Sequence, residues 1–255
     1  MWKWYDSHIT KIENETPTTK RIWLNVQSDE PLQWLAGQFV TMDLPISDKR
    51  LKRWRSYSIA NPPNASNIFN PDISGTEGVA ELEFCVVKAE NSTGGSKYLC
   101  EEATIGTTIR FKGPDGTFVL KQPLDNRDLV FICTGTGVAP FRSMIWDIYN
   151  QQIPHRNIHL IFGARYEKDI LYRQEFEKFE KLLPNFKYDI ALSREKDWQG
   201  YQGYVHTVYT EGYPEKRSDV DFYICGWSNM IDDVVAKLMV DLGYDRGQIH
   251  YELYG

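Results

Sequence analysis

The sequence predicts two domains: an antiparallel β-barrel followed by an α/β domain with a five-stranded parallel sheet. Its 255 residues exceed the roughly 150 of an average domain. Short alternating stretches separated by turns fill the first half, whereas apolar strands alternate with helix-like stretches in the second. The Pro-containing segment at 122–126 separates the halves, so we expect domains over residues 1–124 and 125–255.

A period of two predicts the strands of the first half. In residues 21–26, apolar Ile22, Leu24 and Val26 alternate with polar neighbours, as in a strand with one buried face. Similar patterns predict strands over residues 38–44, 56–60, 79–88, 107–112 and 117–120. Turn formers at 61–63, 74–75 and 113–116 separate them. Many short strands with few helices favour an antiparallel barrel.

In the second half, apolar strands and helices alternate. Strands are expected over residues 129–133, 159–163, 187–192, 222–225 and 249–253. After Gly226, Ser228 is the expected N-cap of a helix with one apolar stripe, which Gly243 can end. A second helix is expected over 170–183. This alternation predicts a parallel sheet with crossover connections.

Composition excludes several classes of protein. Hydrophobic residues make up 42% and charged residues 25% of the chain, as in globular proteins with a core. The net charge of -6 gives no reason to expect nucleic acid as ligand. No stretch approaches the roughly 20 apolar residues of a membrane span, and the N-terminus lacks a signal peptide, so we expect a cytoplasmic protein. The four cysteines fit no zinc or iron–sulfur spacing, and no metal site is predicted.

Two segments have the composition of phosphate-binding loops. The first strand of the second half runs into Thr134, Gly135, Thr136 and Gly137 and then into a helical segment. Glycines at the carboxyl end of a parallel strand let the backbone approach a pyrophosphate, so we favour phosphate binding over a ligand-free turn. Gly94, Gly95 and Ser96, before a short helical segment, form a second candidate cradle.

A short strand combines a cation with an aromatic ring. Arg55 and Tyr57 share one face of the strand, whereas Ser56 and Ser58 point to the other. A guanidinium beside a stackable ring suits a ligand that carries a phosphate and a flat ring system. The alternative is a surface arginine beside a half-buried tyrosine.

In this order, the motifs resemble the ferredoxin–NADP(+) reductase family of FAD-dependent flavoprotein reductases. They are RSYS, GGS, GPDGTF and TGTGVAPFRS, then LYRQEF, SRE, YICG and a terminal ELY. The resemblance covers nearly the whole chain from residue 55 onward. It implies an FAD-binding barrel followed by a parallel-sheet domain that binds the nicotinamide nucleotide. The chain departs from the family by adding Gly255 after the terminal tyrosine.

The resemblance also implies roles at FAD. Arg55 would pair with the flavin pyrophosphate, Tyr57 would stack on the isoalloxazine ring, and Ser58 would donate a hydrogen bond toward its N5 edge. Further cofactor-binding residues would be Ser56, Cys85, Val86, Val87, Gly94, Gly95 and Ser96.

At the nicotinamide end, the resemblance implies four catalytic residues: Ser58, Cys225, Glu252 and Tyr254. Cys225 would contact the nicotinamide beside Gly226, Glu252 would lie near the hydride-transfer site, and Tyr254 would cover the flavin. Thr134 would lie where the two cofactors meet, with Gly135, Thr136 and Gly137 facing the dinucleotide.

The residues expected at the coenzyme 2′-phosphate favour NADPH over NADH. Arg194, in the family's Ser-Arg-Glu motif, and Arg165 are the two candidate cations. Ser193 and Tyr204 would complete this part of the site. Gln202 stands where plant members have a lysine, so a preference for NADH stays open.

We therefore expect a reductase that takes a hydride from NADPH onto FAD and exchanges single electrons with ferredoxin or flavodoxin. These carriers are acidic, and a basic cluster formed by Lys49, Arg50, Lys52, Arg53 and Arg55 is a candidate docking patch. One alternative is an NADH-dependent reductase component that feeds an oxygenase. Another is a flavin-free binding module of the same fold. The sequence leaves the oligomeric state open, and a monomer is compatible with it.

Overall fold

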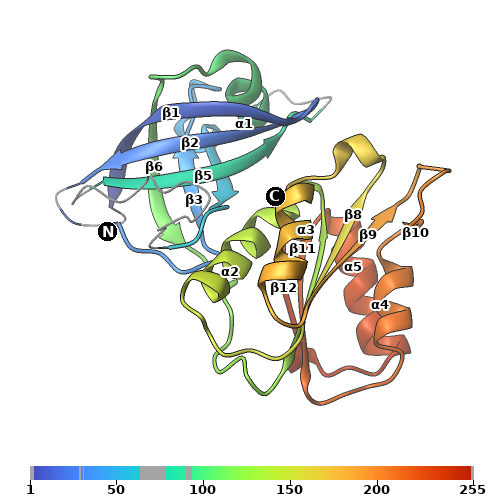
Figure 1. Cartoon of the computed structure of the whole chain (residues 1–255). Helices are drawn as coiled ribbons and strands as arrows, with labels where there is room; N and C mark the ends of the chain where they lie inside the picture. The colour runs from blue at the N-terminus through green and yellow to red at the C-terminus, as the bar shows by residue number, and fades with distance from the viewer. Residues whose placement is uncertain (1–2, 29, 31, 64–78, 90–93, 254–255) are drawn as a thin grey trace. The chain divides into compact units, whose positions relative to one another are not determined.

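The computed structural model describes residues 3–28, 30, 32–63, 79–89 and 94–253. The chain forms two compact units. Unit 1 combines Met1–Leu120 with Ala139–Gln151, and unit 2 combines Lys121–Val138 with Gln152–Gly255. One helix of the second half, α2 (Val138–Asn150), thus packs with the first half of the chain (Figure 1).

The strands of unit 1 form an antiparallel sheet in the order β4-β3-β6-β1-β2-β5. They are β1 (Trp4–Thr16), β2 (Thr19–Gln27), β3 (Phe39–Asp43), β4 (Trp54–Ser58), β5 (Val79–Val87) and β6 (Thr108–Asp115). The two edges meet where the Ala60 amide donates to the Glu83 carbonyl at 2.8 Å. The Asn61 side chain donates to the Glu81 carbonyl and accepts from the Glu83 amide, each at 2.8 Å. These bonds close the sheet into the predicted barrel.

The predicted alternation places the barrel core. Ile22, Leu24 and Val26 of β2 are all buried, as expected from their spacing. They pack in one apolar cluster with residues from the other strands, including Val40, Phe84 and Phe111. Burial of this one face of each strand stabilises the barrel, at roughly 25 cal/mol for each Å² of apolar surface.

Two predictions for the barrel were wrong. Residues 117–120 are not a strand, because Phe118 packs edge-on against Phe141 of α2, with ring centroids 5.7 Å apart, rather than into the sheet. The turn expected at 113–116 begins later, since β6 pairs with β3 as far as Asp115. Strand β1 was not predicted, because its outward-facing polar residues outnumber its buried ones.

Short helices complete unit 1. A 3-10 turn, η1 (Arg50–Lys52), precedes β4. The helix expected after the Gly-Gly-Ser segment is one turn, α1 (Gly95–Lys97), that continues as a π-helical turn, η2 (Tyr98–Glu102). The η2 turn rests on β5, where the Cys100 thiol lies 3.6 Å from the Val86 carbonyl oxygen.

Unit 2 is a parallel sheet in the order β10-β9-β8-β7-β11-β12, as predicted. Its strands are β7 (Asp128–Thr134), β8 (Ile158–Ala164), β9 (Phe186–Leu192), β10 (Tyr201–Gln202), β11 (Val220–Gly226) and β12 (Ile249–Leu253). Five of them are the predicted strands. The sixth, β10, has two residues, which is too few for a periodic pattern.

Helical segments connect these strands (Figure 1). They are η3 (Gly135–Gly137), η4 (Glu167–Asp169), α3 (Arg173–Leu182), α4 (His206–Gly212), α5 (Ser228–Ala236), the π-helical η5 (Lys237–Asp241) and η6 (Arg246–Gln248). The N-cap of α5 is Trp227 and not Ser228, because the chain enters the helix directly from the turn at Gly226. Within the described residues, the longest helix has 13 residues and no helix could span a membrane.

Candidate cofactor sites

In unit 1, the glycines before η2 pack against the cation and the ring of β4. A Cβ atom on Gly95 would lie 2.7 Å from both Arg55 Cγ and Tyr57 Oη, and one on Gly94 would lie 3.1 Å from Arg55 Nη2. Backbone amides at the start of α1 therefore lie beside the guanidinium and the phenol. This cradle suits a ligand that joins a phosphate to a flat ring.

Two backbone carbonyls close to Arg55 in the chain hold its guanidinium in place. Its Nη1 donates to the carbonyls of Lys52 at 3.0 Å and of Trp54 at 2.7 Å. Burial raises the pKa of the Tyr57 hydroxyl above its ordinary value, an effect that nearby Arg55 partly offsets. Tyr57 is thus a neutral, half-buried ring near a fixed positive charge.

The other residues predicted at FAD differ in their burial and in the direction that their side chains face. Ser56 faces away from it and lies 3.1 Å from the Thr41 hydroxyl. Ser58 is buried at the end of β4. Cys85, Val86 and Val87 lie at the end of β5, next to η2, and the first two of them are buried. Burial of the Cys85 and Val86 side chains favours contact with a cofactor through the backbone of this segment.

In unit 2, the glycine-rich loop packs directly on the end of β11. A Cβ atom on Gly137 would lie 2.3 Å from the Cys225 carbonyl oxygen, and one on Gly226 would lie 2.4 Å from Thr134 Oγ1. The Thr134 hydroxyl also accepts a hydrogen bond from the Trp227 amide at 3.2 Å. Only glycine fits at both positions, so the loops after β7 and β11 approach each other closely, with the Thr134 hydroxyl between them.

The strand order makes this meeting point the expected ligand crevice. From β7 the chain proceeds to β8 and β9 on one side, whereas β11 lies on the other side of β7. In open parallel sheets, ligands bind where the strand order reverses, at the carboxyl ends of the strands. Thr134, Gly135 and Thr136 lie at this point and are half-buried.

The predicted catalytic residues of unit 2 lie at this edge in different environments. Cys225 is fully buried, opposite Cys133 of β7 in the sheet. Burial chiefly, and then Cys225, raises the pKa of the Cys133 thiol well above its ordinary value. Glu252 pairs with Cys225 in register on β12 and is half-buried. Tyr254 lies outside the described residues.

Both arginines predicted at the 2′-phosphate lie side by side. The Arg194 amide donates to the Arg165 carbonyl at 2.9 Å, and the Ser193 amide donates to the Ala164 carbonyl at 3.0 Å. Both arginines are exposed, and neither pairs with a carboxylate in the described part of the chain. Tyr204, 71% exposed, follows β10 at the same edge of the sheet.

A hollow of about 540 Å³ adjoins this arginine pair. It is lined by Tyr166, Glu167, Lys168 and Glu195. Its carboxylates are already engaged: Glu167 pairs with Arg173 at 2.5 Å, and Glu195 accepts from the Glu167 amide at 3.2 Å. Arg165 and Arg194 directly precede two of its lining residues, Tyr166 and Glu195.

Comparison with known proteins identifies both units. The oxidoreductase FAD-binding domain model matches residues 6–120, and the oxidoreductase NAD-binding domain model matches residues 131–236. Ferredoxin--NADP reductase B of Sorangium cellulosum is 30% identical over 98% of this chain and 97% of its own length. The chain belongs to the ferredoxin–NADP reductase family. It is an FAD-dependent oxidoreductase with a nicotinamide-nucleotide domain, as the resemblance implied.

This chain spans different shares of the proteins to which it is similar. The phenol hydroxylase P5 protein of Acinetobacter pittii is 30% identical over 98% of this chain, which spans 65% of that protein. The ferredoxin NADP+ reductase of Neisseria gonorrhoeae, solved with bound FAD and NADP, superimposes with a TM-score of 0.79 at 20% identity, covering 99% of each chain. At that identity, the likeness shows the fold alone.

The residues of this family member fit both cofactors. The cradle at Gly94 and Gly95 has no room for side chains and lies against a fixed guanidinium, as an FAD pyrophosphate requires. Gly137 and Gly226 likewise add no side chains of their own to the crevice of unit 2, which suits a dinucleotide. We find no group of metal-ligating side chains in the described ranges.

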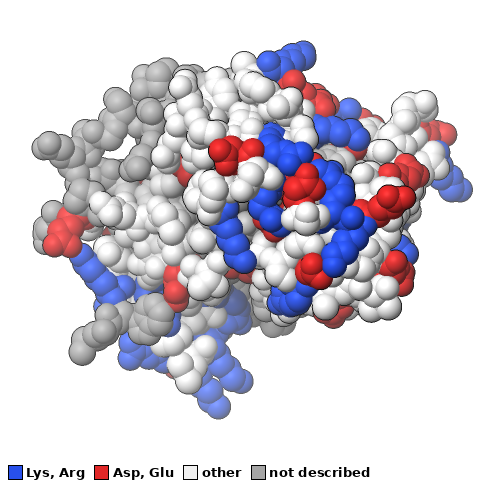
Figure 2. Space-filling view, turned by 90° about the horizontal axis from the view of Figure 1, so that it is seen from below, with Lys and Arg blue, Asp and Glu red and all other residues white. Residues whose placement is uncertain are grey.

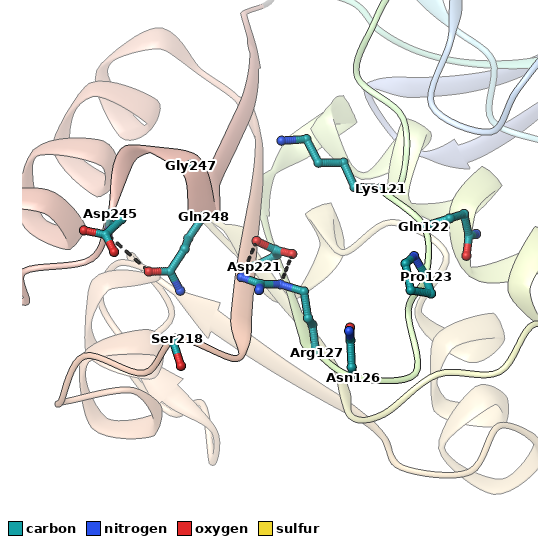
Figure 3. Close-up of a pocket in the computed structure, with 10 residues that line it drawn as sticks. All are labelled: Lys121, Gln122, Pro123, Asn126, Arg127, Ser218, Asp221, Asp245, Gly247 and Gln248. Carbon is teal, nitrogen blue, oxygen red and sulfur yellow. Dashed lines mark hydrogen bonds and ion pairs between the residues drawn. The ribbon is translucent and has the colours of Figure 1, made fainter.

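At the opposite, amino-terminal ends of the parallel strands, unit 2 has a hollow of about 430 Å³ (Figure 3). Asp221 lies on one wall and receives two bonds from Arg127, at 2.5 and 3.0 Å. Burial would raise the pKa of Asp221, but His250 and Arg127 hold it below its usual value. On another wall, Gln248 accepts from the Asp245 amide at 3.2 Å. Asp221 and Gln248 are thus engaged in bonds within the protein. We therefore assign these residues a structural role and do not assign the hollow to a second cofactor.

Basic and acidic side chains also interleave on the face seen from below (Figure 2). At the amino-terminal strand ends, Arg217 bonds to Asp128 at 2.6 Å and to Asp219 at 3.0 Å, and Arg156 bonds to Asp219 at 2.8 Å. We refer to Arg156, Arg217, Asp128 and Asp219 as the strand-end cluster. Because its charges alternate in sign, it forms a self-contained network and not a basic patch.

Trp227 is an exposed residue at the crevice that was not predicted from the sequence. Its side chain is 67% exposed beside the glycine-rich loop. Its position directly after the Cys-Gly pair that ends β11 was the available signal, because side chains there border the ligand crevice of a parallel sheet.

Proposed function

We propose that this protein oxidises NADPH and passes the electrons one at a time to a small acidic carrier, a ferredoxin or flavodoxin. NADPH gives up a hydride, which carries two electrons, and becomes NADP+. Two carrier molecules each accept one electron, and one proton is released. Bound FAD supplies the chemistry that couples the two-electron donor to the one-electron acceptors.

The packing of Gly94 and Gly95 against Arg55 and Tyr57 is the observation that carries this proposal. In this proposal, Arg55 neutralises the FAD pyrophosphate and Tyr57 packs on the isoalloxazine ring. Ser58 donates to the ring edge, with Ser56 and the end of β5 around it. These residues bind and orient the cofactor; positioning of this kind contributes much of the rate in reactions between two bound rings.

At the carboxyl edge of unit 2, Thr134 to Gly137 bind the dinucleotide backbone, and Gly226 leaves room for it. Cys225 and Glu252 act near the nicotinamide, with Tyr254 over the flavin. Because the Cys225 thiol is buried, its role is to shape the floor of the crevice rather than to exchange protons.

The coenzyme in this proposal is NADPH. Arg165 and Arg194 are adjacent, exposed and without carboxylate partners in the described residues, as a phosphate site requires. Ser193 and Tyr204 flank them.

A specific observation favours a second candidate function. Similar chains include an oxygenase component, the anthranilate 1,2-dioxygenase electron transfer component of Acinetobacter baylyi, which is 31% identical over 90% of this chain and 61% of that protein. An NADH-dependent reductase feeding an oxygenase is that candidate.

Anaerobic reduction of the FAD-loaded protein by NADPH and by NADH separates these functions. Faster flavin bleaching by NADPH supports the first candidate, and faster bleaching by NADH supports the second. Arg194→Ala should raise the KM for NADPH roughly tenfold, the loss of about 1.4 kcal/mol of charge-assisted bonding, and leave the KM for NADH unchanged. Lys181→Ala, on the exposed side of α3, is the matched control. A colourless protein that cannot be reconstituted with FAD would reject both.

The carrier-docking surface in this proposal is the basic segment around η1. Lys49, Arg50 and Lys52 are exposed there, whereas Arg53 pairs with Asp43 at 2.7 Å and Arg55 faces the cradle. Exposed cations accelerate encounters with an acidic protein at low salt. Replacing Lys49, Arg50 and Lys52 by Gln should slow carrier reduction at low salt and flatten its dependence on ionic strength. An unchanged salt dependence would remove this surface from the proposal.

A further inference from the structure

An exposed indole, to which the proposed function has so far assigned no role, lies at the crevice of unit 2. Trp227 follows β11 directly, and 67% of its surface is exposed. Single exposed aromatic residues are common and need no explanation by themselves. Two observations locate Trp227, one for its backbone and one for its indole ring.

The first set of contacts holds the backbone of Trp227. Its amide donates to Thr134 Oγ1 at 3.2 Å, and its carbonyl accepts from the Ile231 amide at 3.1 Å in the first turn of α5. A Cβ atom on Gly226, at φ +145°, would lie 2.4 Å from Thr134 Oγ1, so the chain before Trp227 packs closely on this loop. Trp227 is therefore anchored to the loop after β7 and to its own helix.

The second contact locates the ring. Indole Nε1 lies 3.9 Å from the place that a Cβ atom on Gly135 would occupy. Gly135 itself has φ +53°, in the left-handed region that favours glycine. The indole thus lies next to the glycine-rich loop, and most of its surface remains open to solvent.

The strand order shows which half of a dinucleotide would meet this ring. Arg165 and Arg194 follow β8 and β9, on one side of β7, whereas Trp227 follows β11 on the other. A dinucleotide with its adenosine phosphate at the arginines and its pyrophosphate at Gly135 must extend toward β11. Its nicotinamide half therefore ends beside Trp227.

We infer that Trp227 is a binding residue for the nicotinamide half of the coenzyme, whose ring and ribose pack against the indole face. This inference rests on the proposed function, because it takes the glycine-rich loop as the dinucleotide site. Aromatic faces bind flat heterocycles by stacking, with little dependence on hydrogen-bond pattern. The indole contributes affinity for the intact coenzyme and none for its adenosine half.

Two ligands that share the adenosine half provide the test. Equilibrium binding of NADP+ and of 2′,5′-ADP is measured on the FAD-loaded wild-type protein, Trp227→Ala and Trp227→Phe. Trp227→Ala should raise the Kd for NADP+ about tenfold, the change that 1.4 kcal/mol of stacking produces. It should leave the Kd for 2′,5′-ADP within twofold, and Trp227→Phe should retain most of the NADP+ affinity. If NADH proves the better donor, NAD+ and ADP replace the two ligands.

The controls separate the possible failures. Val240→Ala, which also removes an exposed apolar side chain from unit 2, should change neither Kd. Circular dichroism establishes that the Trp227 variants are folded. A Kd for NADP+ that is unchanged or lower in Trp227→Ala, or equal losses for both ligands, would overturn the inference. If wild-type protein binds neither ligand, the proposed function itself fails.

Discussion

Single glycines, rather than charged residues, define the candidate cofactor sites at the scale of the residue. At Gly95 and Gly137 the nearest neighbours of an added Cβ would lie 2.7 and 2.3 Å away. Atoms at such distances overlap, so a side chain at either position would displace its surroundings. At both positions, therefore, the packing of the neighbouring residues requires glycine.

Gly95→Ala should weaken FAD binding by about tenfold or more, because overpacking costs about 1–3 kcal/mol and here displaces Arg55 or Tyr57. The measurement is a titration of FAD into apoprotein, followed by the visible spectrum after gel filtration. Gly212→Ala is the matched control, since nothing lies within 4 Å of a Cβ at that helix end. An FAD affinity within twofold of wild type in Gly95→Ala would contradict the assignment of this cradle.

At the scale of the element, the periodicity and the order of the strands and helices were predictable, whereas their exact ends were not. Buried strands such as β7 and β11 are continuous apolar runs, and their positions follow from the sequence within two residues. The long strand β1 was missed because most of its side chains face water, so its position depends on pairing with β2 and β6. Helix α5 was predicted, but its first turn depends on how Gly226 packs against Thr134, a contact between distant parts of the chain.

The same distinction applies to the candidate site. Arg55 and Tyr57 were predictable as neighbours because strand geometry places alternate residues on one face. Their approach to Gly95 is a tertiary contact that no local pattern encodes. Trp227 had no periodic or compositional signal, and its significance emerges only once β11 is known to lie next to β7.

The strand-end cluster makes stability depend on acid. Hydrogen bonds from Arg217, with help from Arg156, lower the pKa of Asp219 from 3.8 to about 2. A carboxyl whose pKa is lower in the folded state stabilises the fold above its ordinary pKa, and this stabilisation disappears as the pH falls from about 4 to about 2. We therefore expect Arg217→Met to lose less of its stability over this window than wild type loses.

Urea unfolding monitored by circular dichroism, at pH 7 and at steps between pH 4 and pH 2, measures this difference. Arg110→Met is the control, because Arg110 lies 3.8 Å from an exposed carboxylate, Asp6, outside the cluster. Parallel stability profiles for wild type and Arg217→Met would show that Arg217 does not set the acid response.

At the scale of the whole molecule, α2 links the two halves of the chain. It follows the glycine-rich loop of unit 2 in sequence, yet it packs with the barrel strands of unit 1. Arg142 donates to Glu83 at 2.8 Å and to the Ala60 carbonyl at 2.9 Å, and both charged side chains are buried. Ser143 donates to the Asn61 carbonyl at 2.8 Å. The segment after β4 that closes the barrel thus depends on a helix encoded beyond residue 124.

The division at residues 124 and 125 can therefore be tested as a folding boundary. Fragment 1–124 lacks α2, which leaves the acceptors on Glu83, Ala60 and Asn61 without these donors. Each lost hydrogen bond is worth about 0.5–1.5 kcal/mol, and the Phe118–Phe141 contact is lost with them, so the sum is comparable with the margin of stability of a small domain. We expect the fragment to lack a cooperative unfolding transition and to bind FAD far more weakly than the full chain, as measured by calorimetry and flavin titration.

A point variant of the full chain tests the same contact without truncation. Arg142→Met should lower the free energy of unfolding by about 3 kcal/mol, because it removes a buried ion-pair partner of the Glu83 carboxylate, which also pairs with Arg21. Lys88→Met, at an exposed ion pair with Glu101, should change it little. If fragment 1–124 unfolds cooperatively and binds FAD as tightly as the full chain, while Arg142→Met is as stable as wild type, then α2 is not part of the barrel's folding unit.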